Sequence, residues 1–320
     1  MDSQHAFHEL RERLQDVIIG QQKLLDRLLI SLLTGGHFLL EGPPGLAKTK
    51  AVTSLAAAVH ASFQRIQFTP DLMPGDLTGS DVFDPESHSF RFIEGPVFHE
   101  IILADEINRA PPKVQSALLE AMAEHQVTIG GVTRRLPDLF VVMATQNPLE
   151  QSGTYPLPEA QLDRFLMHIV LSYPTEDDEL KILQLDRKLH YGEDAEMLES
   201  RLQPETVLLA RREVAEIHVE EMLEKYIVSI VSATRDLGKL LPEWSDFLLS
   251  GVSPRASIAM LRASSAMAYL NGRDHVIPDD ILEVAPDVLR HRLLLDYAAR
   301  AAGVDADAIV TRLLEIIPVP

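Results

Sequence analysis

Three nearly continuous apolar runs divide the first half of the chain. They cover residues 37–41, 101–104 and 139–144. Strands that are buried on both faces of a parallel sheet have this pattern. Helical patterns alternate with the runs, as a doubly wound sheet requires. We therefore predict an α/β fold with a parallel sheet, and expect the polar segments that follow each run to meet at the carboxyl edge of the sheet.

Helical patterns with start signals fill the second half. Residues 175–178 have the spacing of a capping box, Ser253 is followed by Pro254 at a first helical position, and Pro278 begins another helical pattern. Strand-like runs stop before these signals. The second half is therefore expected to form an all-helical domain.

Two domains also suit the length of the chain, which has 320 residues, of which 46% are hydrophobic. We predict an α/β core over residues 1–198 and a helical domain over 199–320. The helix near 176–190 could pack on either domain, and 192–204 is the expected connector.

The composition excludes several kinds of chemistry. The chain has no cysteine, which rules out disulfides, cysteine-bound zinc, iron–sulfur clusters and thiol nucleophiles. Residues 1–20 mix charged and apolar positions, unlike a secretory signal. The apolar stretch 28–33 is far shorter than the roughly 20 residues that a bilayer crossing needs. We expect a cytoplasmic protein without a membrane span.

The net charge of −19 argues against a surface that binds nucleic acid through bulk electrostatics, because clustered lysine and arginine drive such binding. No nucleic acid is expected as the direct substrate. The net charge is still compatible with a local basic patch, such as a basic pore inside an acidic ring.

A phosphate-binding loop follows the first apolar run and precedes a helical pattern. It consists of Gly42, Pro43, Pro44, Gly45, Leu46, Ala47, Lys48 and Thr49. Backbone N–H groups of such a loop surround the β-phosphate, Lys48 reaches the β- and γ-phosphates, and the Thr49 hydroxyl binds Mg²⁺. Ala47 replaces the glycine usual before the lysine. The structural alternative is an ordinary turn between strand and helix.

The other two runs also end in polar residues. Asp105 is expected to hold Mg²⁺ through water, and Glu106 to orient and deprotonate the attacking water. After the third run, Asn147 can hold that water by its amide. Taken alone, the acidic pair could be solvated charge at a strand end, and Asn147 before Pro148 could be turn chemistry.

Two arginines are suited to neutralising charge on a γ-phosphate. Arg164 follows Asp163, and Arg255 lies at the start of the capped helix in the second domain. One would act from a neighbouring subunit and the other from the helical domain, and an arginine supplied in trans contributes about 10³ to 10⁵ in rate. The alternative for each is a solvated loop residue.

Together these segments resemble the MoxR branch of the AAA+ ATPases, in the helix-2-insert clade. The resemblance covers nearly the whole chain and rests on residues 17–21, 42–49, 105–112, 144–148, 162–165 and 253–256. In this branch alanine before the loop lysine is normal. The α/β core is then a P-loop NTPase core, and the helical domain is its lid.

The resemblance implies roles that spacing alone does not give. Ile19, Gly20 and Gln21 would lie near the adenine. Asn147 would be sensor 1, Arg164 the arginine finger and Arg255 sensor 2. It also implies ATP and Mg²⁺ as cofactors, a homo-oligomeric hexameric ring, and a chaperone-like motor that matures or activates partner complexes, often with von Willebrand factor A-domain proteins.

Two further segments look like insertions that contact substrate or serve as surface loops. Residues 68–79 are rich in turn formers and resemble the insertion loop of the clade. Residues 127–136 predict a hairpin, because Gly130 and Gly131 can form a tight turn between β-branched runs.

The favoured interpretation is an ATP-driven remodeller of a protein client. The alternatives are a motor that acts on nucleic acid and a nucleotide-gated assembly scaffold with little turnover. ATP and GTP are not distinguished by any motif.

Overall fold

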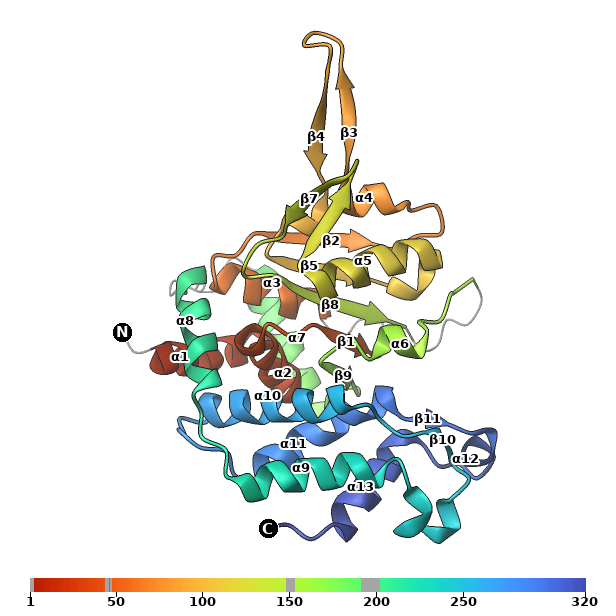
Figure 1. The fold of residues 1–320 in the computed structure, drawn as a ribbon. Helices are drawn as coiled ribbons and strands as arrows, with labels where there is room; N and C mark the ends of the chain where they lie inside the picture. The colour runs from red at the N-terminus through yellow and green to blue at the C-terminus, as the bar shows by residue number, and fades with distance from the viewer. Residues whose placement is uncertain (1–2, 44–45, 47, 148–152, 191–201) are drawn as a thin grey trace. The chain divides into compact units, whose positions relative to one another are not determined.

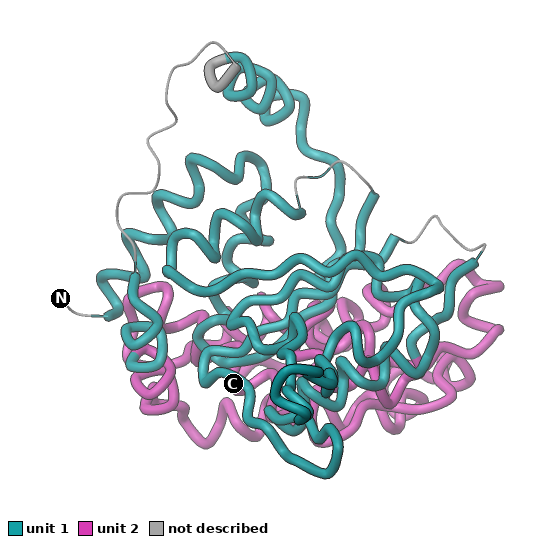
Figure 2. Tube along the Cα trace, turned by 90° about the horizontal axis from the view of Figure 1, so that it is seen from above, with its two compact units in different colours: residues 1–157, 169–209 teal, residues 158–168, 210–320 magenta. Residues whose placement is uncertain are grey.

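The structure is a computed structural model. It describes residues 3–43, 46, 48–147, 153–190 and 202–320. The chain forms two compact units (Figure 2): unit 1 contains Met1–Leu157 and Ile169–Leu209, and unit 2 contains Pro158–His168 and Ala210–Pro320. The domain boundary predicted between residues 198 and 199 lies outside the described residues and stays a prediction.

A five-stranded sheet has the order β2-β5-β8-β1-β9 (Figure 1), and all of it except the first two residues of β9 belongs to unit 1. The strands are β1 (Phe38–Glu41), β2 (Phe63–Gln67), β5 (Ile101–Asp105), β8 (Val141–Gln146) and β9 (Met167–Val170). Neighbours β2 and β5, β5 and β8, and β8 and β1 pair in parallel. The apolar runs lie in β1, β5 and β8, whose apolar side chains are buried. The predicted α/β fold with a parallel sheet is confirmed.

Unit 1 also contains several helices. They are α1 (Ser3–Val17), α2 (Gln22–Thr34), α3 (Lys48–Ala58), α5 (Pro112–Glu124) and α7 (Glu176–His190), with 3-10 turns at Pro96–Phe98 and Ile107–Arg109. Helix α8 (Pro204–Ala215) begins in unit 1 and ends in unit 2. Helix α7, which the sequence left between the two domains, belongs to unit 1. The Thr175 hydroxyl accepts a hydrogen bond from the Asp178 amide at its start.

Two hairpins extend unit 1 beyond the sheet. The predicted hairpin is present as β6 (Gln126–Ile129) and β7 (Val132–Arg135). Gly130 and Gly131 form its turn with φ of 57° and 78°, a conformation that glycine adopts without strain. The second hairpin, β3 (Gly79–Asp84) and β4 (Ser89–Glu94), follows the short helix α4 (Pro74–Thr78) and projects from the unit (Figure 1).

Unit 2 is mainly helical, and the predicted helical character of the second half is confirmed, although one strand pair departs from the all-helical prediction. Its elements are α6 (Glu159–Leu162), α9 (Glu221–Ala233), α10 (Pro254–Leu270), α11 (Pro278–Leu289), α12 (Tyr297–Ala301), α13 (Ala306–Ile316), and 3-10 turns at Leu237–Lys239, Pro242–Trp244 and Arg290–Arg292. A short antiparallel pair, β10 (Leu248–Ser250) and β11 (Leu294–Leu295), adds to these helices. The Ser253 side chain caps α10 by accepting from the Arg255 amide. No helix among the described residues is long and apolar enough to cross a membrane.

Candidate nucleotide site

The predicted phosphate loop joins β1 to α3. The structure describes Gly42, Pro43, Leu46, Lys48 and Thr49, whereas Pro44, Gly45 and Ala47 lie outside the described residues. Helix α3 begins at Lys48. The loop therefore leads into a helix N-terminus, where backbone N–H groups and the helix dipole favour an anion.

The Lys48 ammonium lies beside the carboxylates of the sheet edge. Its Nζ donates to the backbone oxygen of Gly42 over 2.5 Å. Burial lowers the pKa of Lys48, and the carboxylates of Asp105, Glu41 and Glu106 offset part of that effect. A partly desolvated ammonium gains more from a bound phosphate than a solvated one does.

A cavity of about 550 Å³ opens at the carboxyl ends of the parallel strands. It is lined by Leu46, Lys48, Thr49, Lys50, Arg65, Asp105, Glu106, Thr145, Gln146 and Asn147. The three polar segments that follow the apolar runs thus meet in one place, as the topology predicts. Because Thr49 and Asp105 both supply oxygen to this cavity, their donor atoms fit a magnesium ion.

The Thr145 hydroxyl holds the Asp105 carboxylate and the backbone amide of Glu106 at the end of β5. It donates to Oδ1 of Asp105 over 2.5 Å and accepts from the Glu106 amide over 2.9 Å. Thr145 is buried. Glu106 adopts a left-handed backbone with φ of 56°, a strained conformation for a residue with a side chain. The sequence interpretation did not assign Thr145 a role, although it directly precedes the predicted Gln146–Asn147 segment.

Three neighbouring polar side chains hold the carboxylates of Asp105 and Glu106. Arg65 donates to Oδ2 of Asp105 through Nε at 3.1 Å and Nη2 at 2.6 Å. Gln67 donates to Oε2 of Glu106 over 2.8 Å, and Arg109 Nε lies 3.1 Å from that oxygen. The sequence interpretation missed Arg65 and Gln67 because they belong to β2, a strand that it did not predict.

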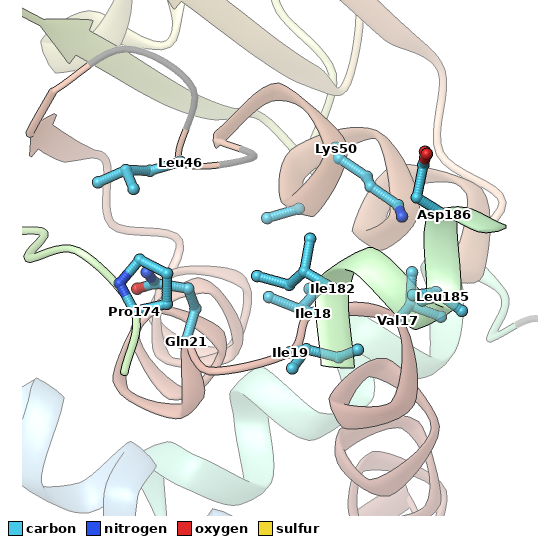
Figure 3. Close-up of a pocket in the computed structure, with 11 residues that line it drawn as sticks. Val17, Ile18, Ile19, Gln21, Leu46, Lys50, Pro174, Ile182, Leu185 and Asp186 are labelled. Carbon is cyan, nitrogen blue, oxygen red and sulfur yellow. The ribbon is translucent and has the colours of Figure 1, made fainter. Parts of the chain in front are cut away.

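A smaller, mostly apolar cavity of about 260 Å³ adjoins the first, since Leu46 and Lys50 line both. Its lining side chains are drawn in Figure 3: Val17, Ile18, Ile19, Gln21, Leu46, Lys50, Ala51, Pro174, Ile182, Leu185 and Asp186. The α1–α2 junction and helix α7 thus form walls of one pocket. An apolar pocket beside a phosphate loop suits an aromatic base.

Gly20 lies where the α1–α2 junction comes close to helix α7. It has φ of 72°, and a Cβ atom there would lie 2.8 Å from Cβ of Asp178 on α7. Only glycine fits this close approach without a shift of α7. Gln21 next to it donates to the backbone oxygen of Ser172 over 3.4 Å. Of the residues that the resemblance places near the adenine, Ile19 and Gln21 line the pocket, and Gly20 lies between them in sequence.

The two predicted arginines, Arg164 and Arg255, both belong to unit 2. Asp163, which precedes Arg164, connects their segments. Its Oδ1 accepts from Nε of Arg292 over 2.8 Å and its Oδ2 accepts from the Ser253 hydroxyl over 3.1 Å. Nη1 of Arg255 lies 3.6 Å from Oδ2. The segments that carry the two arginines are therefore held together within one compact unit.

Arg292 and His291 anchor that segment from inside unit 2. Arg292 is almost fully buried and donates to the backbone oxygens of Phe165, Leu166 and Val288. A ring nitrogen of His291 lies 3.2 Å from the backbone oxygen of Phe165. Burial first, and then the charge of Arg292, holds the pKa of His291 well below its ordinary value.

Because His291 is buried, we expect the free energy of unfolding of the protein to fall at acidic pH. Below its ordinary pKa of 6.5, unfolded His291 binds a proton that the folded protein does not. Its contribution to the free energy of unfolding is therefore complete above that pH and falls by at most about 1.4 kcal/mol per pH unit below it. Urea titrations between pH 7 and 5.5 should show a smaller loss of stability for His291→Asn, while the exposed control His88→Asn follows the unaltered chain. Equal pH slopes for all three proteins would contradict the assignment.

Comparison with known proteins identifies the family. A family model described as "ATPase family associated with various cellular activities (AAA)" matches residues 37–167, and an AAA lid domain model matches 246–313. Chaperone MoxR1 of Mycobacterium tuberculosis is 43% identical over 317 residues, which cover 99% of this chain and 83% of that protein. The chain belongs to the MoxR family of AAA+ ATPases. Membership in the helix-2-insert clade stays a prediction.

Other relatives of this MoxR-family protein match along its whole length. The uncharacterized protein YeaC of Bacillus subtilis is 45% identical over 97% of this chain and 93% of its own. A crystal structure of a candidate ATPase from Cytophaga hutchinsonii is 44% identical, with a TM-score of 0.91, and covers 99% of this chain and 96% of that chain. The core and the lid are therefore both shared with the family.

Proposed function

We propose that this MoxR-family protein binds ATP with Mg²⁺ and hydrolyses it in the cavity at the carboxyl edge of the unit 1 sheet. The observation that carries the proposal is the meeting of the separate polar segments in that cavity. Phosphate-loop residues, an acidic pair at the end of β5 and an amide after β8 are the parts that phosphoryl transfer needs. Family membership supports the same activity.

Each group has a proposed task. The apolar pocket holds the adenine beside Ile19 and Gln21, while Lys48 and the loop amides bind the β- and γ-phosphates. Thr49 and Asp105 hold Mg²⁺, which when bound neutralises charge on the phosphate oxygens.

The chemistry is an in-line displacement by water. Glu106 accepts a proton from a water molecule that Asn147 orients. The water oxygen attacks the γ-phosphorus, and the bond to the bridging oxygen of ADP breaks, which yields ADP and phosphate. Arg255 of the lid and Arg164 of a neighbouring subunit compensate the charge that develops on the phosphate.

The purpose that we propose for this hydrolysis is remodelling of a protein client by a homo-oligomeric, hexameric ring, together with a von Willebrand factor A-domain partner. One relative carries the name of a chaperone, which supports a protein client. The net charge of −19 supports a protein over a nucleic acid as the substrate.

The test is nucleotide hydrolysis by the purified chain across a series of protein concentrations, with ATP and GTP in parallel and Mg²⁺ present. We expect ATP turnover per chain to rise cooperatively with concentration, because the arginine comes from a neighbour. Lys48→Ala should lose nucleotide affinity and turnover. Tight ATP binding by an assembled ring without turnover would favour a nucleotide-gated scaffold, and stimulation by DNA would favour a nucleic-acid motor.

A further inference from the structure

The carboxylate of Asp105 is bonded at both of its oxygens. Thr145 donates to Oδ1, and the Nε and Nη2 atoms of Arg65 both donate to Oδ2. Both donors reach the same oxygen and the Arg65 side chain is 49% exposed, so the ion pair is charge-assisted but open to solvent. The proposed magnesium carboxylate is thus already paired with a cation of the protein itself.

Arg65 and a bound magnesium ion would both interact with the negative charge of Asp105. Arg65 lines the same cavity as Lys48, Thr49 and Asp105. A divalent cation bound there would have to approach a guanidinium whose charge already neutralises Asp105, and like charges at such distances repel each other. Arg65 and a bound metal ion would therefore share the charge of Asp105, and each would weaken the interaction of the other with it.

The local structure allows Arg65 to leave. Its side chain is 49% exposed, whereas that of Asp105 is 16% exposed. The pairing of β2 with β5 continues from Phe63 opposite Ile101 to Gln67 opposite Asp105. The strands thus fix both backbones, and a change of side-chain rotamer alone would move the guanidinium into solvent.

We propose that Arg65 competes with Mg²⁺ for Asp105 and thereby sets the metal affinity of the site. This inference rests on the proposed function, because it assumes that Asp105 serves the metal of a bound nucleotide. Arg65 then keeps Asp105 neutralised until a metal ion, which the nucleotide phosphates also hold, displaces it. Arg65 is a positioning residue in this scheme, because it acts on the metal through Asp105.

The experiment compares three variants with the unaltered chain. Arg65→Gln removes the positive charge, Arg65→Lys keeps it on a different head group, and Arg91→Gln removes a charge from the exposed strand β4. Mn²⁺ serves as the probe, and its binding to each protein saturated with a non-hydrolysable ATP analogue is followed by electron paramagnetic resonance. Circular dichroism melts confirm that each variant is folded.

Removal of the competing cation should tighten Mn²⁺ binding. We expect the apparent dissociation constant of Arg65→Gln to fall by about two- to five-fold, the range for a partly exposed ion pair. Arg65→Lys should stay near the unaltered protein, because it keeps the charge, and Arg91→Gln should match it. Unchanged or weaker Mn²⁺ binding by folded Arg65→Gln would overturn the inference, and so would an equal gain in Arg91→Gln.

A separate measurement distinguishes this inference from the proposed function. Binding of a fluorescent ATP analogue is measured in the presence of a chelator and then with metal. Nucleotide and Mn²⁺ binding without any hydrolysis would contradict only the proposed turnover, and the Arg65 comparison would still decide the competition. If the unaltered chain binds no nucleotide under either condition, the proposed site is wrong and the competition is wrong with it.

Discussion

Glu106→Gln is expected to keep ATP binding and to lower hydrolysis by a factor of about 10² to 10⁴, the usual contribution of a general base. The amide has the shape of the carboxylate but does not accept a proton from water at neutral pH. It also keeps an oxygen that can accept from Gln67, as Oε2 does now over 2.8 Å. The variant should therefore separate binding from chemistry without disturbing the end of β5.

The measurement pairs single-turnover hydrolysis with equilibrium binding of a fluorescent ATP analogue. Glu120→Gln is a matched control, because it makes the same change at an exposed position of α5. Its rate should equal that of the unaltered chain. If Glu106→Gln hydrolyses ATP at an undiminished rate, another group removes the proton and the assignment of Glu106 is wrong.

The sheet could be predicted where its strands are buried on both faces. The segments that became β1, β5 and β8 are apolar throughout, so burial is evident from composition alone. Strand β2 has the sequence Phe63-Gln64-Arg65-Ile66-Gln67 and lies at the end of the strand order. Its mostly exposed or half-buried side chains give no continuous apolar run, and so it was missed.

The hairpins show the same dependence on local signals. The β6–β7 hairpin was predicted because two adjacent glycines specify its turn. The β3–β4 hairpin was not, since both of its faces carry exposed side chains, Phe83 and Phe90 among them. Their rings contact each other at a centroid distance of 5.5 Å. Such cross-strand pairs stabilise a ribbon but leave no inside-and-outside alternation to detect.

In the candidate site, sequence identified the residues that follow buried strands, because topology alone brings strand ends together. It did not identify residues that act through tertiary contacts. Arg65 reaches Asp105 across 40 positions of sequence, and Arg292 reaches Asp163 across 129. Contacts over such separations depend on the register of strands and the packing of helices, which a single sequence does not specify.

The second large effect on ATP turnover is expected from Arg164, the proposed arginine finger. Arg164→Ala should lower ATP turnover by about 10³ to 10⁵, as the loss of a trans-acting arginine does in other phosphoryl-transfer enzymes. The variant keeps the contacts of Arg292 with Asp163 and with the backbone oxygens of Phe165 and Leu166, so we expect the segment to stay anchored. Steady-state hydrolysis at saturating ATP measures the loss, and the melting temperature of the variant reports whether unit 2 is intact.

Mixing two inactive chains decides whether Arg164 acts on its own nucleotide or on that of a neighbour. In a ring assembled at random from equal amounts of Arg164→Ala and Glu106→Gln chains, about a quarter of the interfaces join an intact Glu106 to an intact Arg164 from the next subunit. Turnover should then recover to at most that fraction of the unaltered rate, and neither variant alone should show it. If the two proteins assemble together and no activity returns, Arg164 does not complete a neighbour's site.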